Sequence, residues 1–195
     1  MRNKMIADLI RKNRSCRRFH EEHAVGLETL KELVNLGRLS ASGANLQPLK
    51  YILSRDLKTN ADIFSCLTWA AYLQNWPGPE EGERPAAYIV VLCDNNISQD
   101  AGCDHGIAAQ SILLGAREKG LAGCMLGAIN RKKLRELLHI PPQLAILLVL
   151  AVGKPKEQVV LETVEANGAI RYWRDREGAH HVPKRKLEDI IIAEH

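Results

Sequence analysis

The sequence predicts a fold of the α+β or mixed α/β class, in which helices and strands alternate along the chain. Unbroken apolar runs at 86–93 and 144–153 are typical of strands that are buried on both faces of a sheet. Further strands are expected at 49–54 and 122–127. Because such strands are apolar on both sides, helices are expected to cover both faces of the sheet.

Several helical segments are available to supply this cover. The opening helix has an apolar face that consists of Met1, Met5, Ile6, Leu9 and Ile10. Further helices are expected at about 28–39, about 60–73 and 104–120, and a short last one begins at its cap Asn130 and ends before Pro141. The segment 104–120 is apolar almost all round and rich in small residues, which predicts a central, buried helix.

Length and composition indicate one globular domain, 1–195, because 46% of its 195 residues are hydrophobic and 26% are charged. The net charge of +4 comes from basic residues that are largely interleaved with acidic ones, which does not favour a nucleic-acid partner. The longest apolar run, 144–152, is far shorter than the ~20 residues that span a bilayer, so a soluble protein without a membrane partner is expected. Five scattered cysteines without a C-x-x-C pair argue against disulfides and predict a cytoplasmic location.

Basic residues concentrate in two segments. The segment 11–19, RKNRSCRRF, places five cations around Ser15. A solvated helix end explains such a cluster, but guanidinium groups beside a hydroxyl also offer the donors that a phosphate monoester needs. The segment 183–189, PKRKLED, is typical of a solvated tail when it is taken alone.

Two segments of small residues are candidates for contact with a ligand. The segment 42–48, SGANLQP, offers a permissive backbone and amide side chains that suit the edge of a heterocycle, and a simple turn explains it equally well. The segment 121–128, LAGCMLGA, either leaves backbone N–H groups bare for a ligand or packs tightly within a sheet.

Metal, nucleophile and dinucleotide motifs are not supported. The Cys103-Asp104-His105 and His180-His181 groups lack the spacing of metal ligands, so no metal site is predicted. Cys16 lies beside arginines that favour a thiolate, but no spacing identifies a partner base. Neither a G-x-G-x-x-G motif nor a P-loop occurs in the sequence.

The order of these segments resembles the FMN-dependent nitroreductase family over nearly the whole chain. The resemblance consists of an N-terminal helix, an RS-x-R stretch, a Ser/Gly-rich run that closes in N-x-QP, a central apolar helix and GLAGCMLGAI. It is strongest to short members whose middle and end read like GERPAAYIVVLCD and YWRDREGAHHVPKRKLEDII. The resemblance implies a mixed, mostly antiparallel sheet wrapped by helices, in an obligate homodimer with flavins at the subunit interface. The C-terminal segment 157–195 would be an extended tail that exchanges onto the partner subunit.

By the same resemblance, two parts of the chain would hold the FMN phosphate. Arg14, Ser15 and Arg17 would bind the phosphate and the pyrimidine side of the flavin. Lys184 and Lys186 would reach the phosphate from the tail. The anion for which the basic segments are suited would then be FMN phosphate.

The resemblance also assigns a loop to the flavin of the partner subunit. Ser42, Gly43 and Ala44 match the run that approaches this flavin, and Asn45 and Gln47 would contact the ring or hold the loop in shape.

Main-chain N–H groups of Gly127 and Ala128 match the place where the backbone meets the isoalloxazine ring. The sequence departs from many relatives at Asn13, where they have an arginine, and at Leu49, where they often have an aromatic residue. These departures weaken the inference about the substrate more than the inference about flavin binding.

The predicted activity is transfer of hydride from NADH or NADPH, through FMN, to a nitroaromatic, a quinone or a similar small electron-poor acceptor. Because the flavin carries this chemistry, no catalytic side chain is predicted. Trp69, Trp76 and the loop at 76–83 are candidates for the walls of a pocket, and packing in the core explains either tryptophan equally well. The loop at 75–85 is a candidate lid. The alternatives are another FMN reaction on the same fold, either reductive dehalogenation or flavin fragmentation, a non-catalytic flavin-binding protein, and a zinc protein.

Overall fold

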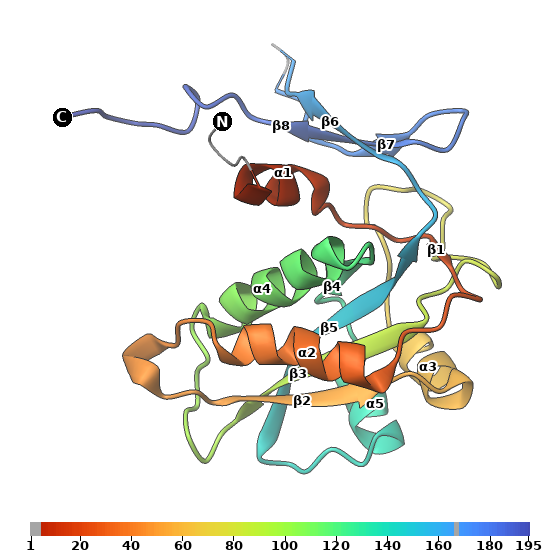
Figure 1. The fold of residues 1–195 in the computed structure, drawn as a ribbon, viewed down its shortest axis with the longest axis vertical. Coiled ribbons are helices and arrows are strands. Elements are labelled where there is room, and N and C mark those ends of the chain that lie inside the picture. The colour runs from red at the N-terminus through yellow and green to blue at the C-terminus, as the bar shows by residue number, and fades with distance from the viewer. Residues whose placement is uncertain (1–4, 166–167) are drawn as a thin grey trace.

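A five-stranded antiparallel sheet forms the body of the molecule in the computed structural model, which describes residues 5–165 and 168–195 (Figure 1). Its strands are β1 (Phe19–His20), β2 (Leu49–Ser54), β3 (Ala87–Asp94), β4 (Ala122–Leu126) and β5 (Leu144–Pro155). The central strand β5 pairs with β3 on one side and with β4 and β1 on the other, and β2 pairs with β3. The predicted strands are therefore confirmed.

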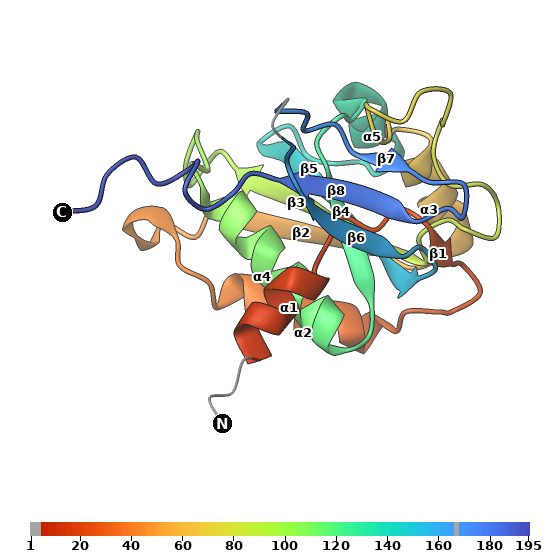
Figure 2. The same ribbon diagram turned by 90° about the horizontal axis from the view of Figure 1, so that it is seen from above.

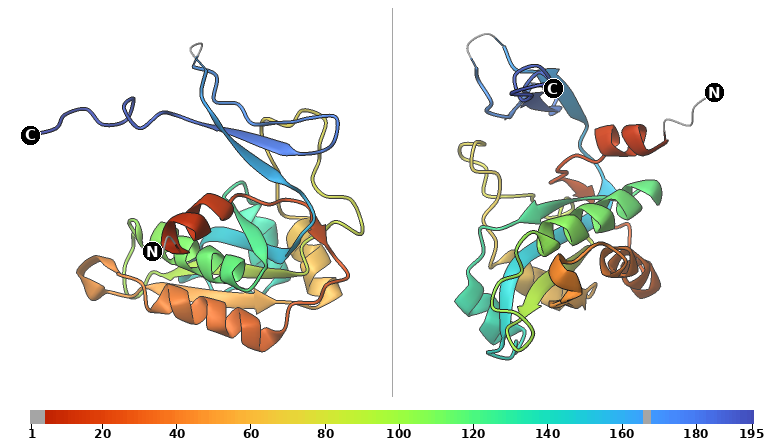
Figure 3. Two further views of the ribbon diagram at one scale, coloured as in Figure 1. Left: turned by 45° about the horizontal axis from the view of Figure 1, so that its top comes forward. Right: turned by 90° about the vertical axis from the view of Figure 1, so that its left-hand side faces the viewer.

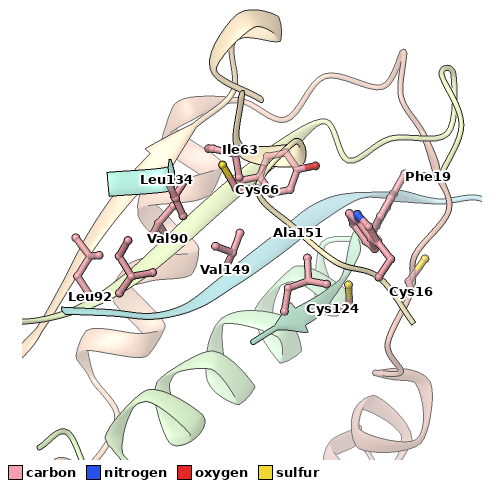
Figure 4. Packing of buried hydrophobic residues seen from close by; sticks show 14 of the residues in the cluster. Cys16, Phe19, Ile63, Cys66, Val90, Leu92, Cys124, Leu134, Val149 and Ala151 are labelled. Atoms are coloured by element: carbon pink, nitrogen blue, oxygen red, sulfur yellow. The ribbon is translucent and has the colours of Figure 1, made fainter. Parts of the chain in front are cut away.

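Helices cover both faces of this sheet. On one face, α2 (Leu27–Arg38) and α4 (Asp104–Glu118) pack on alternate β3 residues such as Ile89. On the other face, α3 (Leu57–Phe64) and α5 (Arg131–Leu137) pack on the neighbouring β3 residues such as Val90 (Figure 4). The alternation follows from the period of two in a strand and confirms the prediction of a sheet that is covered on both sides.

The helices α2 and α4 approach closely through small residues. A Cβ atom at Gly115 would lie 2.2 Å from Leu36 Cδ1 of α2, so a larger side chain would push the helices apart. Only part of α4 is buried, and Ile107 on its outer side is 41% exposed. The prediction of a central, buried helix is thus confirmed for the side of α4 that faces the sheet.

The predicted helix at 60–73 is wrong in its second half. Asp56 caps α3 by accepting a hydrogen bond from Thr59 N at 2.9 Å, and the helix ends at Phe64. Leu67 then forms a bridge with Ile129 of the segment after β4. This tertiary pairing overrides the apolar spacing that suggested a longer helix.

The other helices begin and end close to the expected positions. The helix α1 (Met5–Lys12) corresponds to the opening helix, and the predicted contribution of Met1 lies outside the described residues. Asn130 caps α5 by accepting a hydrogen bond from Lys133 N. None of the described helices is long and apolar enough to cross a membrane.

A separate three-stranded sheet follows β5. It consists of β6 (Val159–Thr163), β7 (Trp173–Arg174) and β8 (His180–Lys184), with β6 parallel to β8 and β7 antiparallel to it. This sheet lies on the same side of the body as α1, and the end of the chain extends away from both (Figures 1 and 2). The chain passes from the body to this sheet once, between β5 and β6 (Figure 3). The fold is α+β with a mostly antiparallel sheet, as predicted.

Candidate functional site

The basic segment after α1 lies against the edge of β4. Ser15 forms a parallel bridge with Gly123, and Cys16 N donates a hydrogen bond to Gly123 O at 3.0 Å. Glycine is required here, because a Cβ atom at Gly123 would lie 2.2 Å from Ala151 O on the neighbouring strand. The close packing of β4 therefore positions Arg14 and Ser15 at the surface of the sheet.

A cavity of about 180 Å³ opens beside Arg14 and Ser15. Its lining comes from the segment after α1, from α4 and from β4: Asn13, Arg14, Ser15, Gln110, Leu113, Gly123 and Met125. Arg14 Nη2 donates to Ile10 O at 2.8 Å, but its buried Nε has no hydrogen-bond partner among the described residues. A buried donor without a partner costs free energy, so the cavity is suited to a ligand that brings an acceptor.

Positive charge continues on the other side of Arg14. A second cavity, of about 380 Å³, is lined by Arg11, Lys12, Arg14 and Arg117, with Glu157 as its acidic residue. Four cations against one carboxylate make this surface attractive to an anion.

Arg17 points to the C-terminal sheet and does not line either cavity. Its Nη1 lies 3.2 Å from His180 Nε2, and its guanidinium lies 5.0 Å from the centre of the Tyr172 ring. Its backbone N–H donates to Glu157, which also accepts from Arg174 Nη2 at 2.9 Å. Burial, assisted by the nearby Arg17 and Arg174, lowers the pKa of His180 to about 4, so its ring is neutral at neutral pH and accepts from Arg17.

The loop 42–47 is held by a buried carboxylate at the start of α4. Asp104 accepts hydrogen bonds from Ser42 Oγ at 2.6 Å and from Gly43 N at 2.9 Å. Ser42 Oγ accepts in turn from Gln47 N at 2.9 Å. These bonds fix both ends of the loop to the body.

The tip of this loop has an unusual backbone. Ala44, Asn45 and Gln47 have φ angles of 47°, 56° and 53°, in the left-handed region that residues with a Cβ atom seldom adopt. Such conformations persist only where surrounding contacts impose them, and they cluster at functional sites. The three side chains are exposed, so they are available to a ligand or to another chain.

Gly127 and Ala128 lie exposed directly after β4. Their carbonyl groups accept hydrogen bonds from Arg131 Nη2 at 3.3 Å and from Thr68 N at 3.0 Å. Within the described parts of the chain, their own N–H groups donate to no acceptor. The backbone therefore presents donors at this point, as one of the two interpretations of the segment 121–128 predicts.

Lys184 and Lys186 lie at the end of β8 and just beyond it. Both are exposed, and neither ammonium group forms an ion pair with a described residue. Neither lysine lines the cavity beside Arg14, and the loop 42–47 does not line it either. Within one chain, the structure thus gathers Arg14 and Ser15 at β4 and leaves the loop and the tail lysines elsewhere.

Two carboxylates anchor segments that lie far from them in sequence. The sequence places Asp104 in a Cys-Asp-His group without the spacing of metal ligands, and in the structure it anchors the loop 42–47. Glu157, whose side chain is fully buried, joins the N-terminal segment to Arg174. No local pattern marks either role, because their partners are far away in sequence. The described residues include no group of three or more side chains that could hold a metal ion.

Comparisons with known proteins agree with this architecture. The model of the Nitroreductase family matches residues 10–154. A protein of Archaeoglobus fulgidus, provisionally named NADH dehydrogenase/NAD(P)H nitroreductase, is 29% identical over 149 residues, which cover 72% of this chain and 80% of that protein. The iodotyrosine deiodinase of Thermotoga neapolitana is 23% identical over 171 residues, 79% of this chain and 90% of that enzyme.

Solved structures show the same fold. A provisionally named nitroreductase from Desulfovibrio desulfuricans, solved in complex with FMN, superimposes with a TM-score of 0.71 at 23% identity and covers 100% of this chain and 99% of its own. An FMN-dependent nitroreductase from Clostridium difficile gives a TM-score of 0.64 at 23% identity, over 77% of this chain and 87% of its own. The family match over residues 10–154 and the sheet with its ordered motifs lead to one conclusion: this chain belongs to the nitroreductase family.

Proposed function

We propose that the protein is a flavoenzyme that uses FMN to transfer electrons from NADH or NADPH to a small electron-poor acceptor, such as a nitroaromatic or a quinone. FMN, when bound, would supply the hydride chemistry, and the residues of this chain would bind and orient it. The observation that carries the proposal for this chain is the buried Arg14 Nε, which lies beside the cavity at Ser15 and has no hydrogen-bond partner among the described residues.

The chemistry of the lining supports a phosphate monoester at this place. Guanidinium donors and a hydroxyl group suit phosphate oxygens, and Arg11, Lys12 and Arg117 add positive charge nearby. The N–H groups of Gly127 and Ala128 are donors of the kind that suits the acceptor edge of a flavin ring. In this arrangement the protein binds and orients the cofactor, and no side chain has to act as a nucleophile.

The loop 42–47 and the tail lysines do not line the cavity beside Arg14 in one chain, which supports a homodimer in which both chains form the complete site. The cavity of about 180 Å³ is smaller than the ~300–1,000 Å³ of typical ligand pockets, so further walls are needed. The loop 42–47 and the tail lysines are exposed and suited to provide them from a second copy. Apolar side chains that lack cover in one chain, such as Ile6 at 73% exposure and Ile192 at 93%, would be buried there.

The visible spectrum of the purified protein, reconstituted with FMN, tests the activity. We expect a flavin band that bleaches anaerobically when NADH or NADPH is added and recovers with a nitroaromatic or a quinone. A flavin band that no donor bleaches would indicate a non-catalytic binding protein, and a colourless protein that contains zinc would contradict the proposal. Iodotyrosine belongs among the acceptors, because release of iodide would favour reductive dehalogenation; irreversible loss of the flavin band would favour flavin fragmentation.

Arg14→Ala tests the cofactor site itself. We expect FMN affinity to fall by about 1.5–3 kcal/mol, because a hydrogen bond to a charged group is lost. Arg17→Ala is expected to lower affinity as well, through its contacts with the C-terminal sheet. The control is Lys31→Ala, which removes an exposed cation whose one ion pair with the described residues is to Glu28. Equal affinity in the Arg14 and Lys31 variants, measured by flavin fluorescence, would contradict the site, and a monomer in light scattering would contradict the dimer.

A further inference from the structure

A third cavity lies between α3, the segment before β3 and the connection from β1 to α2. Its volume is about 510 Å³, and Phe64, Arg84 and Tyr88 contribute to its wall. It shares no lining residue with the cavity beside Arg14, and neither Gly127 nor Ala128 reaches it. The volume falls within the ~300–1,000 Å³ range of small-molecule sites.

Two buried polar atoms in this wall have no partner among the described residues. They are Tyr88 Oη, on a residue that is only 1% exposed, and Arg84 Nε. By contrast, Asn60 in the same wall is fully used, because its Oδ1 accepts from Ser54 Oγ at 2.7 Å and its Nδ2 donates to Ala86 O at 2.9 Å. The fold satisfies one polar side chain in this wall and leaves two buried donors unpaired among the described residues, a pattern that suits a ligand that brings acceptors.

Both unpaired groups, Tyr88 Oη and Arg84 Nε, carry a proton that they can donate. Burial raises the pKa of Tyr88, so its hydroxyl group keeps its proton at neutral pH. The guanidinium of Arg84 lies 4.5 Å from the centre of the Phe64 ring, which holds it in place without using its Nε–H.

We propose that this cavity binds a small organic acid, whose carboxylate accepts hydrogen bonds from Tyr88 Oη and Arg84 Nε. Its compact apolar body would lie against Phe64 and Leu57 of α3 and against Pro85. A hydrogen bond between a carboxylate and a guanidinium is among the strong ones in proteins.

Three carboxylates and two guanidinium groups line the cavity: Glu21, Glu22, Glu81, Arg55 and Arg84. Glu21 accepts from Gly82 N at 2.6 Å and from Arg84 N at 3.3 Å, and Glu22 lies 3.3 Å from His20 Nδ1. Because these contacts leave the carboxylate charges in place, selectivity for an acid depends on the directed donors Tyr88 Oη and Arg84 Nε and not on the net charge of the wall.

Binding of benzoate to the full-length protein tests this proposal by calorimetry and by tryptophan fluorescence. Trp69 reports on the site, because its ring centre lies 5.7 Å from that of Phe64. We expect saturable binding of benzoate with a change in emission, and weaker binding of benzamide and benzylamine, which match its shape but lack the carboxylate. Stronger binding of either neutral or cationic analogue would overturn the assignment of an acid.

Substitutions locate the binding. Tyr88→Phe and Arg84→Gln should each weaken benzoate binding by about tenfold or more. Without benzoate, Tyr88→Phe should not lower the melting temperature, because the hydroxyl group has no partner in the described part of the chain. Arg14→Ala serves as the control for the proposed flavin site and should leave benzoate affinity unchanged. Absence of binding, or equal affinity in the Tyr88 and Arg84 variants, would overturn the proposal whatever the fate of the flavin assignment.

Discussion

The body of the molecule and its C-terminal sheet are held together by different interactions. The body buries an apolar cluster on each face of its five-stranded sheet. The C-terminal sheet is joined to the rest by polar and ring contacts, among them Arg174 with Glu157 at 2.9 Å and Arg174 over the Trp76 ring at 4.2 Å. Stability of the body is therefore expected to depend on the burial of apolar side chains. Placement of the C-terminal sheet is expected to depend on a few specific contacts and, in the proposed homodimer, on a second copy of the chain.

The largest expected effect comes from removing the same side chain in each region. Leu150 of β5 is fully buried, whereas Leu161 of β6 is 40% exposed. Leu150→Ala should lower the free energy of unfolding by about 2–5 kcal/mol, because it leaves a cavity in the core. Leu161→Ala should cost about 1 kcal/mol or less in a single chain.

Urea denaturation at several protein concentrations measures both variants. Equal losses at every concentration would break the contrast between the two regions. A loss in the Leu161 variant that appears only at concentrations where the protein is dimeric would sharpen it, because the partner would then cover β6.

The next effect concerns an ionic cluster at the junction between the regions. Glu83 accepts from Arg18 Nε at 2.5 Å and Nη2 at 2.6 Å, and lies 3.0 Å from Lys156 Nζ. The Arg18 hydrogen bond, with help from Lys156, lowers the pKa of Glu83 from 4.5 to about 2. The stabilisation is therefore present above pH ~4.5 and is lost as the pH falls towards about 2.

Glu83→Gln should lower the free energy of unfolding at neutral pH by about 1–2 kcal/mol, a value reduced from the full shift because water screens a cluster near the surface. It should also flatten the acid limb of a plot of unfolding free energy against pH. Glu28→Gln is the matched control, since Glu28 is 80% exposed and, among the described residues, forms an ion pair with Lys31 alone. An acid limb that is the same in both variants would show that this cluster does not stabilise the folded chain.

The sequence predicted the body well, and the reason is its apolar pattern. Uninterrupted runs such as the one that forms β5 are buried on both sides, so local pattern and tertiary structure agree. The helix α3 ends at Phe64 because Leu67 pairs with Ile129, a contact that no local pattern reveals. The three-stranded C-terminal sheet is not predicted from the sequence, where the resemblance implies only an extended tail, because the two-residue strand β7 carries no periodic signal.

The candidate site was predictable in part, for a similar reason. The RS-x-R stretch and the small residues of the segment 121–128 are short-range signals, and the structure brings Ser15 and Gly123 together. The anchoring role of Asp104 depends on a loop about sixty residues earlier in the chain, as its bond to Ser42 shows. Arg17 carries the expected charge, but its contacts with His180 could not be predicted without the placement of the C-terminal sheet.

A smaller effect is expected from a polar anchor inside the body. Asp104→Asn keeps an acceptor but removes the charge that holds Ser42 Oγ and Gly43 N. We expect the free energy of unfolding to fall by about 1 kcal/mol. If the loop 42–47 completes the partner's site, FMN affinity should fall about fivefold as well.

Asp56→Asn is the control, because asparagine caps a helix almost as well as aspartate does. A loss of stability without any loss of FMN affinity would confine Asp104 to a structural role.

The smallest effect separates two neighbouring histidines of the C-terminal sheet. Burial, with the charges of Arg17 and Arg174, lowers the pKa of His180 to about 4. Hydrogen bonds to Asp175 and Glu162 instead raise the pKa of His181 above its usual value. At His180 the unfolded chain takes up a proton before the folded chain does, so stability is lost as the pH falls from about 6.5 to about 4. At His181 the folded chain binds the proton more tightly, so its stabilisation is complete below pH ~6.5 and is lost as the pH rises through the folded pKa.

An NMR titration of the ring protons measures both values in the intact protein, and His181→Gln and His180→Gln assign the signals. Because the low pKa of His180 requires burial and the nearby charge of Arg17, it reports whether the C-terminal sheet is docked on the body in solution. Because His181 is paired within its own sheet, its pKa should stay high even when that sheet separates. A pKa near 6.5 for His180 together with a raised one for His181 would mean that the C-terminal sheet is formed but detached, so that its placement, unlike that of the body strands, depends on the second chain or on the cofactor.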